Sequence, residues 1–218
     1  MLDKKLTMTL IFLTLVFLAI GIKTVDSIGY GSMLNSLSIG FVVSSIFYFL
    51  VVYMPEYKRR SLVRKHLEGQ YIQFKMSCIS TFLILSDSQE YPNKEELLNL
   101  SEFRRYFKMK NTRGESRWGA VANSLEESDY YLKEIIYYLQ ILNEEIKYTR
   151  NVVNVNDPEV VNFLNNLSQI IMRMELTEGE YEDVKSLCKF LWSVFTGWDL
   201  AKGYSETDII KDIIERAK

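Results

Sequence analysis

LTMTLIFLTLVFLAIGI, residues 6–22, and MLNSLSIGFVVSSIFYFLVVYM, residues 33–54, are apolar segments without a single charged side chain. At a rise of about 1.5 Å per residue, a helix of the second segment is long enough to cross a membrane. The first segment is about long enough if its flanking residues help. The linker between them, residues 23–32, is too short to hold a domain. We therefore predict a transmembrane helical hairpin, residues 1–54, with spans at 6–22 and 33–54.

A cleaved signal peptide is the alternative for the first segment, because Lys4 and Lys5 precede an apolar run. The run is long for a signal peptide, however, no small-residue cleavage site follows it, and a second apolar segment comes at once. Lys23 is the only basic residue of the linker, whereas several basic residues flank the hairpin. The positive-inside rule therefore predicts that both termini are cytoplasmic. The basic residues that flank the hairpin are Lys4, Lys5, Lys58, Arg59, Arg60, Arg64 and Lys65.

Residues 55–218 are predicted to form one cytoplasmic all-α domain. Apolar residues recur there every three or four positions, which is the period of an amphipathic helix, and no alternating pattern predicts a strand. Pro55 is expected to end or kink the second span, because proline lacks a backbone donor and clashes with the preceding turn. The expected fold class is all-α, a two-helix transmembrane hairpin plus a cytoplasmic helical bundle. Its helices are predicted at residues 56–86, 94–108, 121–146, 157–175, 180–200 and 205–217.

Two of these helices have start signals. Asp157 followed by Pro158 combines a capping side chain with a ring whose fixed φ suits the first turn. Ser205 and Asp208, three residues apart, resemble a capping box for the last helix, which is expected to reach Ala217. Both signals place a helix boundary within a few residues.

The segment 121–146 has the clearest periodicity of the chain. Its heptad seam predicts one long helix, for which two interpretations are open. The helix is either the centre of an intramolecular bundle or a seam between subunits. The seam consists of Val121, Leu125, Ser128, Leu132, Ile135, Leu139, Leu142 and Ile146.

Catalytic and metal sites are poorly represented. His66 is the only histidine, which excludes zinc sites built from several His and Cys ligands. No phosphate-binding P-loop or dinucleotide glycine pattern occurs. Cys78 and Cys188 both fall on the predicted cytoplasmic side, where a disulfide is not expected. We expect no enzyme activity, no catalytic residue, no metal and no cofactor.

The second span contains an unusual number of small and polar residues. Ser36, Gly40 and Ser44 recur every four positions and form a face that lets another helix approach closely. One interpretation is packing within the hairpin alone. The other is a homo-oligomer in which these faces line a water-filled path. The candidate pore and helix-packing residues are Asn35, Ser36, Ser38, Gly40, Ser44 and Ser45.

The stretch RRYFKMKNTRGESRW, residues 104–118, has six Lys and Arg residues against one Glu, in a chain of net charge −2. Three interpretations are open: solvated charge, contact with anionic membrane lipids, or a site for a phosphate-rich ligand. Arginine binds phosphate bidentately, and aromatic rings stack on bases. The candidate residues for an anionic nucleotide are Arg104, Arg105, Lys108, Lys110, Arg113, Arg117 and Trp118.

A two-span hairpin ending in VVYMPEYKRR, followed by a helical domain with LWSVFTGWDLAKGY near its end, resembles small bacterial two-span membrane proteins. In layout it is similar to the channel subunit, the membrane effector, of Hailong-type antiphage defence. The resemblance implies a homo-oligomeric channel in the bacterial inner membrane, with a tetramer as the candidate stoichiometry. It also implies a short DNA oligomer as ligand, made by a partner nucleotidyltransferase, which holds the pore shut until infection removes it.

The leading hypothesis is therefore a ligand-gated, homo-oligomeric membrane effector or ion channel that senses an anionic nucleotide or oligonucleotide. The alternative is a membrane-anchored helical scaffold or sensor that binds a protein partner. An enzyme that uses the inner leaflet as substrate is a third class, which the missing catalytic groups disfavour.

Overall fold

The computed structural model describes residues 4–24, 30–86, 91, 93–152, 157–177, 180–199 and 203–216. These residues are almost entirely helical, which confirms the all-α fold class. The chain forms two compact units, residues 1–62 and 63–218. The unit boundary lies eight residues beyond the domain boundary expected at 54, because the helix that begins at Met54 continues across it.

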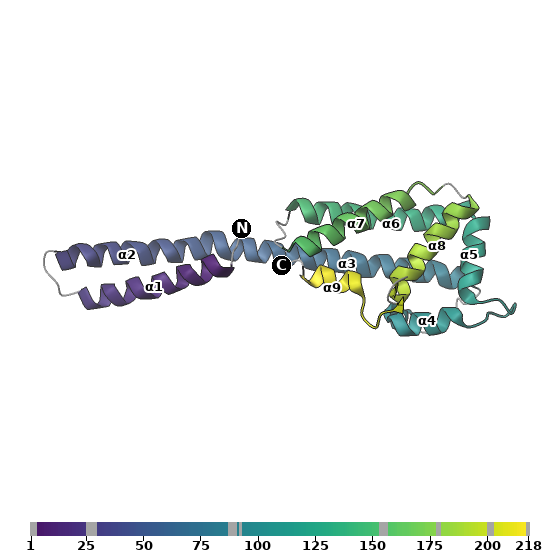
Figure 1. Cartoon of the computed structure of the whole chain (residues 1–218), viewed down its shortest axis with the longest axis horizontal. Helices are drawn as coiled ribbons and strands as arrows, with labels where there is room; N and C mark the ends of the chain where they lie inside the picture. Colours follow the sequence, from purple (N-terminus) through teal and green to yellow (C-terminus); the bar gives the residue numbers. More distant parts are fainter. Residues whose placement is uncertain are drawn as a thin grey trace. The chain divides into compact units, whose positions relative to one another are not determined.

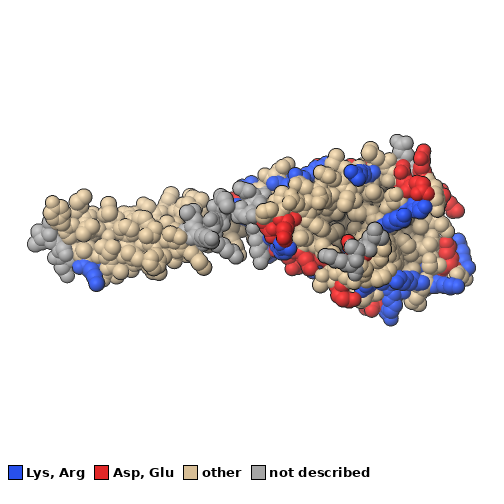
Figure 2. Space-filling view, in the orientation of Figure 1, with Lys and Arg blue, Asp and Glu red and all other residues tan. Residues whose placement is uncertain are grey.

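The first unit is a pair of apolar helices, α1 (Lys4–Thr24) and α2 (Tyr30–Tyr48). Both are long and apolar enough to cross a membrane. Phe17 of α1 stacks on Phe41 of α2 with ring centroids 4.4 Å apart. Most other large side chains of the pair point outward, and Figure 2 shows a surface almost free of charge. An apolar surface of this extent is typical of contact with lipid or with another protein.

A π-helical turn, η1 (Phe49–Tyr53), joins α2 to α3 (Met54–Leu85) without a non-helical residue. The backbone N–H of Met54 bonds to the carbonyl of Phe49, five residues back. The cause is Pro55, which donates no hydrogen bond and whose ring would clash with the carbonyl one turn earlier. Pro55 therefore widens the helix for one turn: of the two expected effects, an end or a kink, the helix does not end there.

The second unit contains the remaining helices and one short hairpin (Figure 1). Its core lies between α3 and the helices that follow. Among the described residues, nineteen of its buried hydrophobic side chains come from α3, α6 and α8 alone, including Leu67, Phe82, Leu139 and Phe195. The other elements are η2 (Lys94–Leu98), α4 (Leu100–Lys108), α5 (Arg117–Glu127), α6 (Asp129–Val152), α7 (Pro158–Met174), α8 (Tyr181–Thr196), β1 (Trp198–Asp199), β2 (Gly203–Tyr204) and α9 (Ile209–Arg216).

The predicted helix 121–146 is two helices. Ser128 has an extended backbone (φ −124°, ψ 100°) between α5 and α6, and the two helices run in different directions in Figure 1. A Ser-Asp pair favours a helix start over a helix interior, which is the local reason for the break. Apart from Ser128, the seam residues of both helices are buried in the core of the unit, which favours the intramolecular interpretation.

Two further boundaries differ from the sequence prediction. The segment 94–108 breaks at Asn99, whose side chain accepts hydrogen bonds from the N–H groups of the first turn of α4. The helix predicted to reach residue 200 ends at Thr196, because Gly197 adopts a left-handed backbone (φ 65°). A side chain at Gly197 would lie 3.0 Å from Leu100 and 3.2 Å from the carbonyl of Ser205. The predicted end at Leu200 lies outside the described residues.

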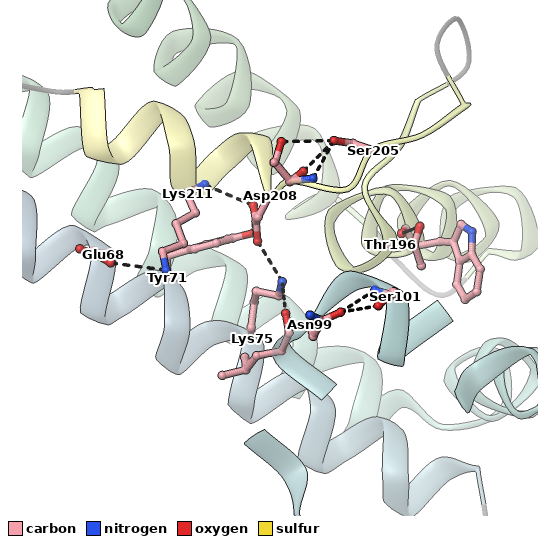
Figure 3. Close-up of polar contacts among 12 residues, drawn as sticks. Glu68, Tyr71, Lys75, Asn99, Ser101, Thr196, Ser205, Asp208 and Lys211 are labelled. Atoms are coloured by element: carbon pink, nitrogen blue, oxygen red, sulfur yellow. Dashed lines mark hydrogen bonds and ion pairs between the residues drawn. The ribbon is translucent and has the colours of Figure 1, made fainter. Parts of the chain in front are cut away.

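The start of α9 is fixed by Asp208 instead of by a capping box. Asp208 accepts a hydrogen bond from the N–H of Lys211 at 3.2 Å, whereas the Ser205 hydroxyl bonds within its own turn to Thr207. The same Asp208 carboxylate also faces α3 (Figure 3). It accepts from the hydroxyl of Tyr71 at 2.9 and 3.0 Å and from the ammonium of Lys75 at 3.0 Å. One carboxylate thus joins the C-terminal segment to the central helix.

Tyr71 and Lys75 are both buried. Burial, reinforced by the Asp208 charge, raises the pKa of Tyr71, so its hydroxyl stays protonated and acts as a donor. The Lys75 ammonium also lies 5.4 Å from the centre of the Phe195 ring. Tyr71 and Lys75 therefore lie in the middle of the core, where a buried charge is destabilising unless an opposite charge pairs with it.

Candidate functional site

The basic segment is exposed because α4 buries its opposite face. Leu100, Phe103 and Phe107, spaced three and four apart, point into the core. This spacing leaves Arg105 and Lys108 exposed and Arg104 partly exposed. Figure 2 shows Lys and Arg side chains gathered at the end of the unit where α4 lies.

Arg104 and Lys108, one turn apart on α4, converge on a single aromatic ring. The Arg104 guanidinium lies 4.9 Å and the Lys108 ammonium 4.5 Å from the centre of the Tyr204 ring. Arg104 is also 3.5 Å from the carboxylate of Glu206, and its side chain is only 13% exposed. Cation–π contact with Tyr204 holds both cations close together at the β2 strand.

The other predicted basic residues lie elsewhere. Arg105 pairs with Glu102 on its own helix. Arg117 stacks on the ring of Tyr106 at 4.1 Å and donates to its carbonyl at 3.3 Å, which caps the end of α4. The structure thus brings Arg104 and Lys108 together and gives Arg105 and Arg117 separate local partners.

The turn between α4 and α5 carries the two remaining cations. Lys110 pairs with Ser116 in a β-bridge, and Gly114 has a positive φ of 83° that closes the turn. Lys110 and Arg113 are exposed, and the N–H of Arg113 bonds to the side chain of Asn111. Both cations are presented to solvent on a short, hydrogen-bonded loop.

Trp118 does not lie on the basic surface. It packs edge-on against Phe82 at 5.3 Å and tilts against Trp192 at 5.1 Å. Trp118 also forms one wall of a groove of about 430 Å³ between α5, α8 and the β1–β2 hairpin. The groove is lined by Trp118, Ala122, Asn123, Glu126, Tyr181, Val184, Lys185, Cys188, Lys189, Trp192, Trp198 and Tyr204.

This aromatic groove contains all three tryptophans of the chain. Sequence reasoning identified only Trp118. The helical spacing of Tyr181, Lys185, Cys188 and Trp192 on α8 was a signal for the rest, since these residues share one face. Tyr204 is shared between the groove and the Arg104–Lys108 pair. The basic surface and the groove therefore meet at one ring.

The groove offers no activated nucleophile. Burial, together with the nearby Glu126, raises the pKa of Cys188 to about 12, which keeps the thiol protonated. His66 lies 3.2 Å from the Glu145 carboxylate, so its partner is an acid and not a serine or cysteine. In the described ranges, no group of three or more His, Cys, Asp or Glu side chains is placed to hold a metal ion.

The two cysteines yield a first prediction. Iodoacetamide at pH 8 should alkylate neither Cys78 nor Cys188 in the folded, full-length protein in detergent, because burial raises both pKa values. A thiol of pKa about 12 forms more than about a thousandfold less thiolate at this pH than a free cysteine. Mass spectrometry should find both sites modified after denaturation in urea. Rapid modification of the folded protein at Cys188 would contradict this placement.

In the first unit, the predicted pore residues fall into two groups. Ser38 and Ser45 are buried, and Gly21 of α1 approaches Ser38 so closely that a side-chain carbon there would lie 3.4 Å from it. Asn35 lies beside the same glycine, and its side-chain oxygen is buried without a hydrogen-bond partner among the described residues. These three residues pack the hairpin.

Ser36, Gly40 and Ser44 face outward. They line an open groove of about 700 Å³ together with Phe17 and three further apolar residues. The Ser36 hydroxyl bonds to the carbonyl of Ser32 on its own helix. A side chain at Gly40 would meet no atom within 4 Å, so α1 does not pack against this position.

No protein-family model, curated protein or solved structure gives a significant match to this chain.

Proposed function

We propose that the protein is a homo-oligomeric membrane effector whose helical unit binds an anionic nucleotide or oligonucleotide and thereby gates an ion-conducting pore. The observation that carries this proposal is the unbroken helix from Tyr30 to Leu85. Its first part is apolar and exposed, and its second part supplies Leu67, Phe82 and other core residues of the helical unit. In the proposal, α3 is the covalent helical link between this core and the apolar helix.

The outward face of α2 supports assembly. Ser36, Gly40 and Ser44 form a groove that a neighbouring helix can enter closely, and membrane helices associate through such small-residue faces. In the proposed oligomer, this face packs against the next subunit or lines the pore. The basic residues after the second span, among them Arg59 and Arg60, support a topology with both termini in the cytoplasm, as the positive-inside rule predicts.

The Arg104–Lys108 pair supports an anionic ligand. Two cations held together on one ring form a binding site for phosphate, in which charge-assisted hydrogen bonds are stronger than neutral ones. Within this proposal, the ligand is a short DNA oligomer from a partner nucleotidyltransferase, the setting is bacterial antiphage defence, and a tetramer is the candidate assembly. Gating then requires different ligand affinities in the open and closed states.

Ion flux through liposomes that contain the purified full-length protein tests the proposal. We expect flux that changes when a deoxyadenylate trimer is added on the side of the helical unit. Gly40→Leu should abolish the flux by filling the small-residue face, whereas Val43→Leu, at an exposed position of the same helix, should not. Absence of ion flux under every ligand condition would overturn the proposal of a pore.

Binding of a fluorescent deoxyadenylate trimer in detergent tests the ligand site separately. The double variant Arg104→Glu, Lys108→Glu should bind at least about tenfold more weakly, because each charge-assisted contact is worth about 1.5–3 kcal/mol. Lys133→Glu, an exposed lysine on α6, is the matched control and should bind as the wild type. Equal affinity of the double variant and the control would remove Arg104 and Lys108 from the site.

A membrane-anchored scaffold that binds a protein is the second candidate. The observation in its favour is a row of exposed rings on α6, formed by Tyr130, Tyr137 and Tyr148. Exposed aromatic side chains are enriched at protein interfaces. A scaffold gives no ion flux and loses its partner when these tyrosines are replaced by serine, so the liposome measurement separates the two functions.

A further inference from the structure

We propose that the aromatic groove between α5, α8 and the β1–β2 hairpin receives a base of the anionic ligand, while Arg104 and Lys108 hold the adjacent phosphate. This inference rests on the proposed function and specifies its ligand as one with a stacking ring next to a phosphate. It assigns a role to Trp192, Trp198 and Tyr204, none of which belongs to the basic segment.

The size and walls of the groove fit a single base. Its volume of about 430 Å³ lies within the range of small-ligand pockets, about 300–1,000 Å³. Trp118 and Trp192 come from the helices α5 and α8, Trp198 and Tyr204 come from the hairpin, and Val184 adds an apolar lining residue. Flat aromatic walls of this kind stack on bases of any sequence.

The charges around the groove favour an anion. Lys185 and Lys189, one turn apart on α8, line it, and Arg104 and Lys108 lie against its Tyr204 ring. The acids nearby include Glu126 in the lining, Glu115 at 2.6 Å from the lining residue Asn123, Glu182 at 3.1 Å from Lys185, and Glu206 beside Arg104. The cations next to the Tyr204 ring are the part of these surroundings that suits a phosphate. A neutral aromatic ligand leaves them unused, whereas a nucleotide uses both the rings and these cations.

Tyr204 joins the proposed base site to the proposed phosphate site. One residue contacts both cations of α4 and lines the groove, so a base stacked near Tyr204 places its phosphate within reach of Arg104 and Lys108. The hairpin that carries Tyr204 leads through Ser205 to Asp208 and thus to Tyr71 and Lys75 of α3. The groove is therefore connected through these contacts to α3, the helix that is continuous with α2.

The experiment compares two probes on the full-length protein in detergent: a deoxyadenylate trimer and an abasic trimer with the same phosphates. Tryptophan fluorescence reports directly, because the only three tryptophans all line the groove. The adenine-containing trimer should change the emission and bind at least about tenfold more tightly than the abasic trimer, since each stacked base contributes that much. Anisotropy of labelled probes gives both affinities.

Two variants locate the effect. Trp198→Leu removes one wall of the groove, and Ala122→Leu fills the groove without replacing a tryptophan. Each should bring the affinity for the adenine-containing trimer down to that for the abasic trimer. Ser186→Leu, an exposed position of α8 outside the groove, is the matched control and should keep the difference. Circular dichroism and urea unfolding establish that the variants are folded.

The outcomes separate the two proposals. Equal binding of both probes, weakened by Arg104→Glu with Lys108→Glu, overturns the assignment of the groove as a base site and leaves the phosphate site. A preference for adenine that survives both Trp198→Leu and Ala122→Leu also overturns the groove. If neither probe binds, the nucleotide ligand itself is wrong, and both proposals fall.

Discussion

Replacing Asp208 with alanine is expected to lower the free energy of unfolding of the helical unit by about 3–5 kcal/mol. Within the described residues, Asp208 is the ion-pair partner of Lys75, whose side chain is only 3% exposed. Without the carboxylate, the ammonium stays buried next to the rings of Tyr71 and Phe195 with no counter-charge. Tyr71 loses its acceptor, and α9 loses the cap at its first turn.

Urea titration of the full-length protein in detergent measures this loss. Tryptophan emission follows the helical unit alone, because all three tryptophans lie in it. The double variant Lys75→Met, Asp208→Asn should recover most of the stability, since it removes both charges and keeps an acceptor for Tyr71.

The control for this series is Lys133→Ala, which breaks the exposed pair with Asp129. Both partners of that pair are more than three-quarters exposed, so the change should stay within about 0.5 kcal/mol. An Asp208→Ala variant that loses no more than this control would show that the buried pair does not hold the C-terminal segment.

The features of the fold that sequence reasoning predicted correctly are encoded within a few residues. Asp157 accepts a hydrogen bond from the N–H of Glu159, and α7 begins at Pro158, as the Asp-Pro pair predicted. The long helix after the second span, α3, ends one residue from its predicted end at residue 86. Caps and periodicity are local properties, so a single chain segment is enough to read them.

The errors arise where a local signal and a longer pattern compete. The heptad spacing continued through Ser128, but the break there lets α5 and α6 bury the same seam from two directions. Likewise, large apolar residues predicted α8 as far as residue 200, whereas Gly197 ends it, and the chain turns back as a hairpin. A period describes which face is buried, and it does not specify whether the helix is continuous.

The residues of the candidate site could be predicted only in part from the sequence, for a different reason. The basic segment is contiguous in sequence, so Arg104 and Lys108 were found. The aromatic groove combines Trp118 of α5 with Trp192 of α8 and Tyr204 of β2, which are brought together only by the packing of the unit. Trp118 was therefore assigned to the basic surface, although its ring packs on Phe82 and Trp192.

Replacing Phe103 with alanine is expected to cost about 3–5 kcal/mol of unfolding free energy, the usual loss for a fully buried phenylalanine. Phe103 lies at the centre of the aromatic cluster, with its ring centre 4.3 Å from that of Phe107 and 4.9 Å from that of Phe195. It also contacts Trp118 and Trp192, each at 6.2 Å, which form one side of the groove.

The companion variant Phe103→Leu keeps most of the volume and should lose less than about 1.5 kcal/mol. Tyr130→Ala, at a ring that is 70% exposed, serves as the surface control and should stay within about 0.5 kcal/mol. Urea titration compares the three. Because Phe103 supports the groove from beneath, Phe103→Ala should also shift the tryptophan emission of the folded state to the red, as water reaches Trp118 and Trp192. A large stability loss without this shift would mean that the groove does not depend on the cluster below it.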